Sequence, residues 1–225
     1  MTAREIELLF VDEDLVVANK PSGLLVHRGW ANDEDVAMTR VRDALGQRVD
    51  PVHRLDRGTS GALLFARTKA AASALGAAFE AGAVDKRYLA LVRGNPPDEG
   101  VIDYPIPRSE GGPRVDAVTR YRVVARSSVA RCSLVAATPE TGRLHQIRRH
   151  LRHLGHPLIG DVTYGDGAEN RAYRADYDLH RLALHAVHLA FDHPIDGTRV
   201  AVTAPIPLDL AGALARLGLP IEEVS

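Results

Sequence analysis

The sequence is poor in several residue types whose scarcity excludes whole classes of protein. Cys132 is the only cysteine, so neither an internal disulfide nor a zinc ribbon is available. The N-terminus has no basic segment followed by a long apolar run, which argues against a secretory signal. No apolar stretch approaches the ~20 residues of a membrane span. We therefore expect a cytoplasmic protein without membrane contact.

Net positive charge is also absent, because 28 lysine and arginine residues are balanced by 29 acidic ones and the formal net charge at pH 7 is −1. A nucleic-acid partner would therefore have to be bound by local patches and not by a global positive field. Arginine nevertheless outnumbers lysine heavily, and its planar guanidinium suits phosphates and base edges. A GC-rich genome would favour arginine everywhere, so only the placement of particular arginines bears on function.

The hydrophobic pattern predicts more strands than helices. Strands are expected at 6–11, 14–20, 61–67, 86–93, 118–125, 131–138, 181–191 and 198–204. Helices are expected at 36–45, 69–82 and 143–155. Because few strands are followed by a helix and another strand, we predict an α+β fold with a mixed, largely antiparallel sheet and packed helices. We expect one domain over 1–225, in which the proline- and glycine-rich stretch 94–114 is a surface loop or a joint between two halves.

The segment HRLDRGTSG (53–61) places an aspartate between two arginines. Arg54 and Arg57 should keep the Asp56 carboxylate ionised, which suits a nucleophile or a general base. A salt bridge in a loop before a strand is the plainer explanation of the same residues. Ser60 does not indicate a hydrolase, because a nucleophile elbow requires glycine two residues later and this chain has alanine.

The expected helix 143–155 carries basic residues without an acidic residue until Asp161. These basic residues include Arg143, His145, Arg148, Arg149 and Arg152. Arg148 and Arg152 are one helical turn apart, so this face could hold phosphates together with a buried carboxylate. A solvated helix surface would be expected to carry compensating acidic residues one turn away. The spacing therefore favours a functional face.

Metals and nucleotide cofactors have little support in the sequence. The pairs His150–His153 and His185–His188 lack a completing carboxylate or cysteine, so we expect no metal site. Neither a dinucleotide-binding fingerprint nor a P-loop occurs. Tyr88 follows Lys86 and Arg87 at the start of a strand, where it could stack on a base, although a packed strand residue is the commoner role.

Together these segments resemble the RluA-type family of pseudouridine synthases. The motifs are HRLDRGTSG (53–61), KRY (86–88), TGRLHQIRRHLRHLGHPLIGD (141–161), RLALHA (181–186) and the opening DEDLVVANKPSGLLVH (12–27). The resemblance spans nearly the whole chain and implies the catalytic fold of that family, without the S4-type RNA-binding domain that several relatives carry. It also implies breakage of the uridine N1–C1′ bond, rotation of the base and rejoining through C5.

The resemblance assigns roles to particular residues. Asp56 matches the essential aspartate, Tyr88 the active-site tyrosine and Arg148 the basic partner of Asp56. Asp56 could attack the sugar, add to the base or abstract a sugar proton, and the residues leave these three open. Arg54 is expected to fill the space of a flipped base. Arg143, His145, Arg149 and Arg152 are expected to bind RNA, and no cofactor is implied.

Three segments resemble the branch of the family that acts on tRNA. They are VHRGW (26–30), HQIRRH (145–150) and GDVTYGDGAENR (160–171), and they imply uridine 65 in the T-arm stem as the target. Ribosomal RNA is the alternative substrate, and a non-catalytic RNA-binding module is the alternative from another class. A metallohydrolase is the third alternative, and it lacks a ligand set. We infer no obligate protein partner.

Overall fold

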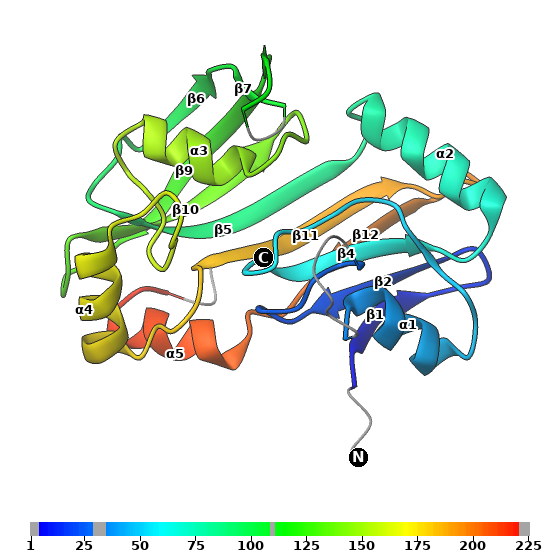
Figure 1. The fold of residues 1–225 in the computed structure, drawn as a ribbon, viewed down its shortest axis with the longest axis horizontal. Helices are drawn as coiled ribbons and strands as arrows, with labels where there is room; N and C mark the ends of the chain where they lie inside the picture. Colours follow the sequence, from blue (N-terminus) through cyan, green and yellow to red (C-terminus); the bar gives the residue numbers. More distant parts are fainter. Residues whose placement is uncertain (1–4, 29–34, 109–110, 221–225) are drawn as a thin grey trace. The chain divides into compact units, whose positions relative to one another are not determined.

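The computed structural model of the protein describes residues 5–28, 35–108 and 111–220 (Figure 1). Strands outnumber helices, and the sheet is mixed and mostly antiparallel, with helices packed on it. The predicted α+β fold class is therefore confirmed, and none of the described residues forms an S4-type domain. Gly29 and Trp30, which belong to one of the tRNA-type segments, lie outside the described residues.

The chain divides into two compact units. The first contains residues 1–86 and 186–205, and the second contains 87–185 and 206–225. The proline-rich stretch 94–114 lies within the second unit, where its described residues include three short strands. No helix in the described part of the chain is both long enough and apolar enough to cross a bilayer.

The first unit is built on strands that follow the predicted hydrophobic runs closely, apart from a two-residue strand at 50–51 that was not predicted. They are β1 (Glu7–Val11), β2 (Leu15–Lys20), β3 (Asp50–Pro51), β4 (Ser60–Ala66), β11 (Leu184–Asp192, from Ala186 onward) and β12 (Arg199–Thr203). The order is β1-β2-β4-β11-β12, with β3 beside β4. Gly61 has φ +111°, and a Cβ there would lie 2.2 Å from the carbonyl oxygen of Ala186, so only glycine permits this close approach.

Two helices accompany this sheet. α1 spans Ala37–Leu45 and ends at Gly46, whose φ of +62° is the left-handed conformation that glycine adopts readily. α2 spans Lys69–Glu80, and the Thr68 side chain caps it by accepting a hydrogen bond from the Ala71 N–H. The apolar side chains of α2 pack with those of β2, β4, β11 and β12 in one core cluster.

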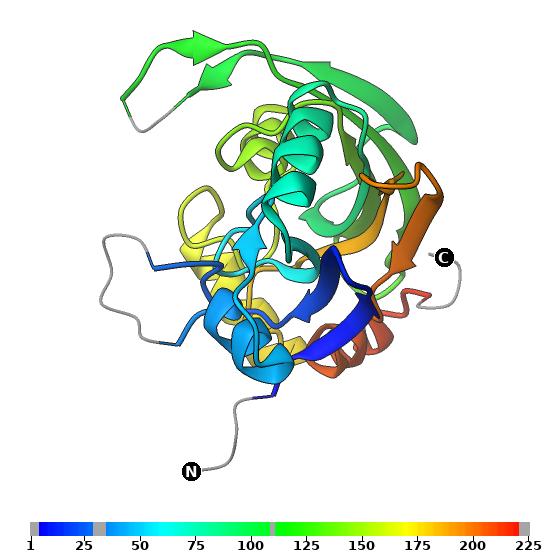
Figure 2. The same cartoon turned by 90° about the vertical axis from the view of Figure 1, so that its right-hand side faces the viewer.

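Four strands of the second unit pair antiparallel to one another in the order β5-β10-β9-β6. Its strands are β5 (Asp85–Arg93, from Arg87 onward), β6 (Glu99–Asp103), β9 (Val118–Arg126) and β10 (Cys132–Pro139). β7 (Ile106–Pro107) and β8 (Arg114–Val115) form a hairpin that extends beyond β6 and β9 (Figure 2). The helices are α3 (Gln146–His153), α4 (Gly167–Tyr177) and α5 (Leu208–Arg216).

The hydrophobic pattern missed some elements of the second unit. Neither α4 nor α5 was predicted. In α4 only Asn170 and Tyr173 are buried, so its apolar stripe is too weak to identify the helix. The predicted helix 143–155 begins three residues late, because His145 adopts a left-handed conformation with φ +53° directly before α3.

Candidate functional site

The loop around Asp56 precedes β4, and its backbone is fixed by residues 20–24 of the same unit. The ammonium of Lys20 is fully buried and donates to the carbonyls of Pro21, Leu24 and Arg57 over 2.9, 2.7 and 3.2 Å. The Gly23 N–H also donates to the Arg57 carbonyl, over 2.8 Å. Because a buried ammonium requires such acceptors, the loop and the 20–24 turn hold each other in place.

Within this loop the Asp56 side chain is half-buried, whereas Arg54 and Arg57 are exposed. The Thr59 N–H donates to the Asp56 carbonyl over 3.0 Å, which closes a tight turn before β4 begins. The predicted catalytic aspartate therefore sits on a rigid turn at the start of a fully buried strand. Such a support is what a reacting group needs in order to keep its geometry.

His53 connects the start of the loop to the core. Its Nε2 accepts the Leu64 N–H over 3.1 Å, and its ring stacks on Phe79 with centroids 4.8 Å apart. Burial of the imidazole, with the charge of Lys86 nearby, lowers the pKa of His53 to about 3. His53 is therefore a neutral structural residue, and it adds no positive charge beside Arg54.

Tyr88 lies on β5 of the second unit, directly opposite Ala137 of β10. It is half-buried, and its apolar part packs against a core cluster that includes Ala90 and Ile147. Tyr88 is therefore a packed strand residue, which is one of the two roles that the sequence allowed. The stacking role that the resemblance implies stays a prediction.

α3 is held on the second sheet by its buried side chains. Ile147 and Leu151 pack in the core cluster, while the Gln146 amide donates to the Val118 carbonyl over 2.9 Å. His150 is buried between the Thr119 hydroxyl and the Tyr104 carbonyl, each 2.9 Å from a ring nitrogen. Burial lowers the pKa of His150, so this histidine belongs to the packing of α3.

Arg148 is the buried cation of α3, and its guanidinium binds Asp161 in a two-pronged contact. Nε lies 2.8 Å from Oδ2 and Nη2 lies 2.9 Å from Oδ1, with side-chain exposures of 8% for Arg148 and 0% for Asp161. Burial alone would raise the pKa of Asp161, but the guanidinium and the N–H groups of Tyr164 and Thr163 hold it below its usual value. Both groups are therefore charged and fixed in direction.

The turn after α3 is shaped to present Asp161. A Cβ on Gly160 would lie 1.9 Å from the Arg181 carbonyl oxygen, and one on Gly165 would lie 2.4 Å from the Asp161 carbonyl oxygen. Asn170 of α4 brackets the turn, because its amide donates to the Asp161 carbonyl and accepts the Gly160 N–H. Only glycines fit at the two ends of the turn.

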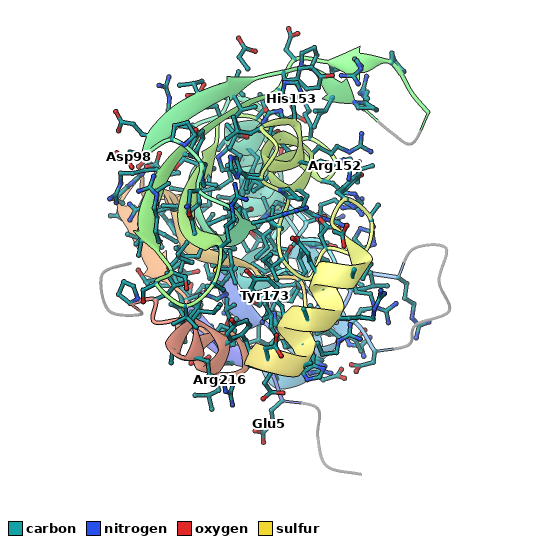
Figure 3. The ribbon with its side chains drawn as sticks, turned by 90° about the vertical axis from the view of Figure 1, so that its left-hand side faces the viewer. Glu5, Asp98, Arg152, His153, Tyr173 and Arg216 are labelled. Atoms are coloured by element: carbon teal, nitrogen blue, oxygen red, sulfur yellow. The ribbon has the colours of Figure 1, made fainter. Side chains whose placement is uncertain are left out.

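Tyr164, in the same turn, is surrounded by basic side chains. Nε of Arg149 donates to its hydroxyl over 2.8 Å, and Nδ1 of His145 lies 3.0 Å from the same oxygen. Arg152 donates to the Tyr164 carbonyl, and its side chain is exposed beside the turn (Figure 3). We call His145, Arg149, Arg152 and Tyr164 the Tyr164 cluster. Three of the predicted RNA-binding residues thus meet at one tyrosine.

The remaining predicted RNA-binding residues lie elsewhere. Arg143 is exposed and donates from Nε to the Asp116 carbonyl over 3.2 Å. Arg54 is exposed in the first unit. Within the described ranges, no carboxylate forms an ion pair with Arg54, Arg143, Arg149 or Arg152. These arginines therefore keep their full positive charge available to an anionic partner.

Neither Asp161 nor Tyr164 is assigned a role by the sequence pattern. Asp161 was noted only as the first acid after the basic segment, and the signal that could have identified it is the Gly-Asp-x-x-Tyr-Gly turn with two tight glycines. Asp56 belongs to the first unit, whereas Tyr88 and Arg148 belong to the second. Their assembly into one active site, with Arg148 beside Asp56, stays a prediction.

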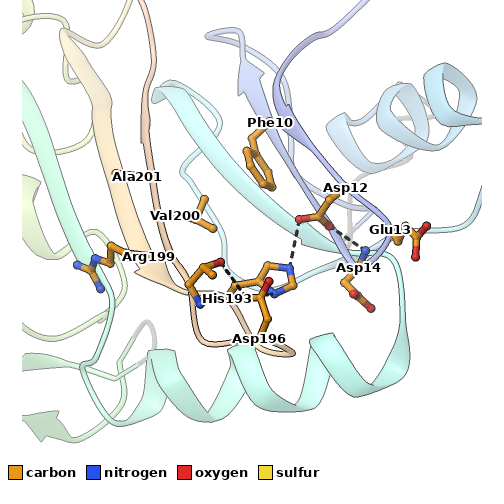
Figure 4. Close-up of a pocket in the computed structure, with 10 residues that line it drawn as sticks. Phe10, Asp12, Glu13, Asp14, His193, Asp196, Arg199, Val200 and Ala201 are labelled. Atoms are coloured by element: carbon orange, nitrogen blue, oxygen red, sulfur yellow. Dashed lines mark hydrogen bonds and ion pairs between the residues drawn. The ribbon is translucent and has the colours of Figure 1, made fainter.

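The first unit contains an acidic cavity of about 520 Å³, which is formed by residues 10–14 and 193–201 and not by the Asp56 loop. Its charged lining residues are the four carboxylates of Asp12, Glu13, Asp14 and Asp196 and the single guanidinium of Arg199. His193 lies 3.2 Å from both Asp12 and Asp196 (Figure 4). Arg67, at the end of β4, bonds to the Asp12 carbonyl, so the cavity and the Asp56 loop lie at opposite ends of β4. Its surplus of carboxylates would repel a phosphate backbone.

Within residues 5–28, 35–108 and 111–220, no group of three or more histidine, cysteine or acidic side chains is arranged to hold a metal ion. Both members of the pair His150–His153 are engaged in other contacts. His150 is packed as described above, and the ring of His153 stacks on Tyr104 with centroids 3.6 Å apart.

Comparison with known proteins gives a consistent result. Residues 14–153 match the family model of RNA pseudouridylate synthase. The chain is 39% identical to tRNA pseudouridine synthase C of Vibrio parahaemolyticus, covering 92% of each, and 41% identical to that of Pasteurella multocida, covering 89% of this chain and 91% of the relative. The solved structure of human RNA pseudouridylate synthase domain containing 4 has a TM-score of 0.77 and 30% identity over 95% of this chain and 94% of that one. The protein is a member of the RNA pseudouridylate synthase family.

Proposed function

We propose that this protein converts a specific uridine of tRNA into pseudouridine. The observation that carries the proposal is the Asp56 loop, whose motif matches the family and whose backbone is fixed by the buried Lys20. The names of the bacterial relatives support tRNA as the substrate. Uridine 65 of the T-arm stem is proposed as the target because the three tRNA-type segments of the sequence imply it. We also propose that the reaction takes place in the cytoplasm.

The reaction is an isomerisation, so its atoms and electrons balance within the uridine. The N1–C1′ bond breaks, the uracil ring rotates, a C5–C1′ bond forms, the C5 proton leaves and a proton is bound at N1. Asp56 is the group that we assign to the bond-breaking step, with Tyr88 stacked on the base near C5. Arg148 is assigned as the cation beside Asp56, and Asp161 would fix its direction.

The target uridine lies inside folded RNA, so it must be flipped out before it reacts. Arg54, exposed beside Asp56, is the side chain that we assign to the vacated space. Arg54→Ala should then raise KM for folded tRNA several-fold, with little effect on a short unpaired RNA that contains the same uridine. Equal effects on the two substrates would remove this role.

Phosphate binding is assigned to Arg143, His145, Arg149 and Arg152. Their surroundings support this role, since the three arginines form no ion pair with a described carboxylate. Each phosphate contact contributes about one unit to the slope of log affinity against log salt concentration. Binding of tRNA should therefore weaken steeply as salt is added.

The decisive experiment is tritium release from 5-³H-uridine-labelled tRNA and, separately, ribosomal RNA, with EDTA present. We expect release from tRNA by the wild-type protein and none by Asp56→Asn, which keeps the shape of the side chain and removes its charge. Filter binding of the same tRNA should be nearly unchanged in that variant. Release from ribosomal RNA alone would overturn the substrate and keep the chemistry.

Two further outcomes would overturn the assignment. Turnover by Asp56→Asn would remove Asp56 from the bond-breaking step. Binding of RNA without tritium release from either substrate would favour a non-catalytic RNA-binding module, which is the alternative from another class.

A further inference from the structure

Tyr164 makes more contacts with cations than a packed surface tyrosine needs. Its hydroxyl accepts from Nε of Arg149 and contacts Nδ1 of His145. Its ring also lies under two guanidinium groups, with centroid distances of 5.0 Å to Arg148 and 5.2 Å to Arg149. Cation–π contacts of this kind hold a guanidinium over the face of an aromatic ring. The tyrosine thus contacts cations through both its hydroxyl and its ring.

The tyrosine is itself held firmly. Its N–H donates to Oδ1 of Asp161 over 3.0 Å, and Asp161 is fully buried against Arg148. Its carbonyl accepts from Arg152. The backbone of the turn therefore cannot shift without disturbing a buried ion pair.

The backbone conformation of His145 is a second, independent observation, because it is strained and must be held by surrounding contacts. His145 is one of two described non-glycine residues with positive φ, at +53°, and no side-chain cap of α3 accompanies it. A non-glycine residue in this region is uncommon and is retained where the surrounding contacts hold it there. Here its ring meets Tyr164 edge-on, with centroids 5.6 Å apart, and Nδ1 reaches the hydroxyl.

A neutral acceptor, unlike a carboxylate, does not compensate the positive charge of the guanidinium that it binds. A guanidinium has five N–H donors, and the Tyr164 hydroxyl uses only the one on Nε of Arg149. The Nη groups keep their donors, and the positive charge is not compensated. The guanidinium is thus oriented and remains able to bind a phosphate in a two-pronged contact.

We propose that Tyr164 is a positioning residue for RNA binding, which orients Arg149, together with His145 and Arg152, toward consecutive phosphates without neutralising them. This inference rests on the proposed function, because it assumes that the Tyr164 cluster contacts RNA. It concerns binding and not bond breakage. Substitution of Tyr164 should therefore change the affinity for RNA, whereas substitution of Asp56 or Tyr88 should change the reaction rate.

The test is Tyr164→Phe, which keeps the ring and removes the hydroxyl. We expect the Kd and KM for tRNA transcripts to rise about three- to tenfold, as is usual for the net loss of one hydrogen bond, with kcat unchanged. Tyr177→Phe is the matched control, because Tyr177 is a half-buried tyrosine of the same unit that packs on Tyr173, away from the Tyr164 cluster. It should leave Kd, KM and kcat unchanged.

A double-mutant cycle shows whether Tyr164 acts through Arg149. In the Arg149→Gln background the Tyr164→Phe substitution should have little further effect on Kd, since the cation that it orients is gone. Full additivity of the two effects would overturn the inference. So would an unchanged Kd in Tyr164→Phe, or a fall in kcat and in the unfolding midpoint without a change in Kd.

The outcomes distinguish this inference from the proposed function. If the wild-type protein releases no tritium from any RNA, the proposed function fails. The Kd values of wild type, Tyr164→Phe and Tyr177→Phe for the same transcripts would still support or overturn the positioning role.

Discussion

α1 in the first unit and α3 in the second are short helices that carry arginines, but the partners of these arginines differ. The arginines of α1 bind carboxylates, whereas the exposed face of α3 binds neutral oxygens. On α1, Arg40 forms a two-pronged contact with Asp35 and Arg42 bonds to Asp43 over 2.7 Å. On α3, Arg149 and Arg152 bind a hydroxyl and a carbonyl of Tyr164. Among the arginines of α3, Arg148 alone binds a carboxylate of the described residues, that of Asp161 in the turn after the helix.

The difference shows what distinguishes a structural arginine from one that remains available to a ligand. A carboxylate orients a guanidinium and cancels its charge, whereas a neutral oxygen orients it and leaves the charge in place. The charge that α3 retains is therefore local, and the net charge of −1 does not reveal it. This is why the composition gave no sign of a nucleic-acid partner while the helix did.

The largest expected effect separates the buried Arg148–Asp161 pair from the half-buried Arg40–Asp35 pair. Arg148→Ala leaves Asp161 buried and unpaired, so we expect the free energy of unfolding to fall by about 3–5 kcal/mol. Arg40→Ala is the control on α1, where the side chains of the pair are 19% and 26% exposed, and it should cost about 1 kcal/mol or less. Urea unfolding followed by circular dichroism measures both. Equal losses would show that burial does not distinguish the two pairs.

A second prediction concerns a basic side chain that the first unit keeps neutral. The pKa of His53 is lowered to about 3, so below the ordinary value of about 6.5 the unfolded chain binds a proton that the folded chain does not. The contribution of the neutral His53 to the free energy of unfolding is therefore complete above pH 6.5. It should fall by about 2 kcal/mol between pH 6 and pH 4.

This prediction is checked by two measurements. Unfolding free energies of wild type and His53→Gln across that range should show the steeper loss in the wild type. The ring resonances of His53 should not titrate above pH 4 in NMR spectra. An inflection near pH 6.5 would show that the imidazole is solvated and that the first unit does not keep this residue neutral.

The smallest expected effect addresses the arginine comparison directly. Arg149→Gln removes a charge that no described carboxylate compensates, so the affinity for tRNA should fall and the salt slope should decrease by about one unit. Arg42→Gln removes the same charge from α1, where Asp43 already neutralises it, and should change the affinity less than about twofold. Filter binding over a salt series measures both. Equal losses would mean that net charge, and not local arrangement, governs binding.

The predicted bounds of the helices and strands agree with the structure where they depend on residues close together in the chain, and they fail where distant contacts decide them. β2, β4, β5 and α2 lie within a residue or two of their predicted bounds, because hydrophobic periodicity and capping residues are local signals. The start of α3 was wrong by three residues, since the left-handed conformation of His145 is supported by contacts with a residue 19 positions away. α4 escaped prediction because its buried residues are few.

The sequence by itself determined the fold class and the family, since both depend on alternating apolar runs and on motifs that are contiguous in the chain. It could also nominate Asp56, Tyr88 and Arg148, whose assembly in one site stays a prediction. Only the tertiary structure decided that Asp161 holds Arg148 and that Tyr164 orients Arg149. Those contacts cross an irregular turn shaped by two tightly packed glycines, and no periodicity encodes which side chains such a turn brings together.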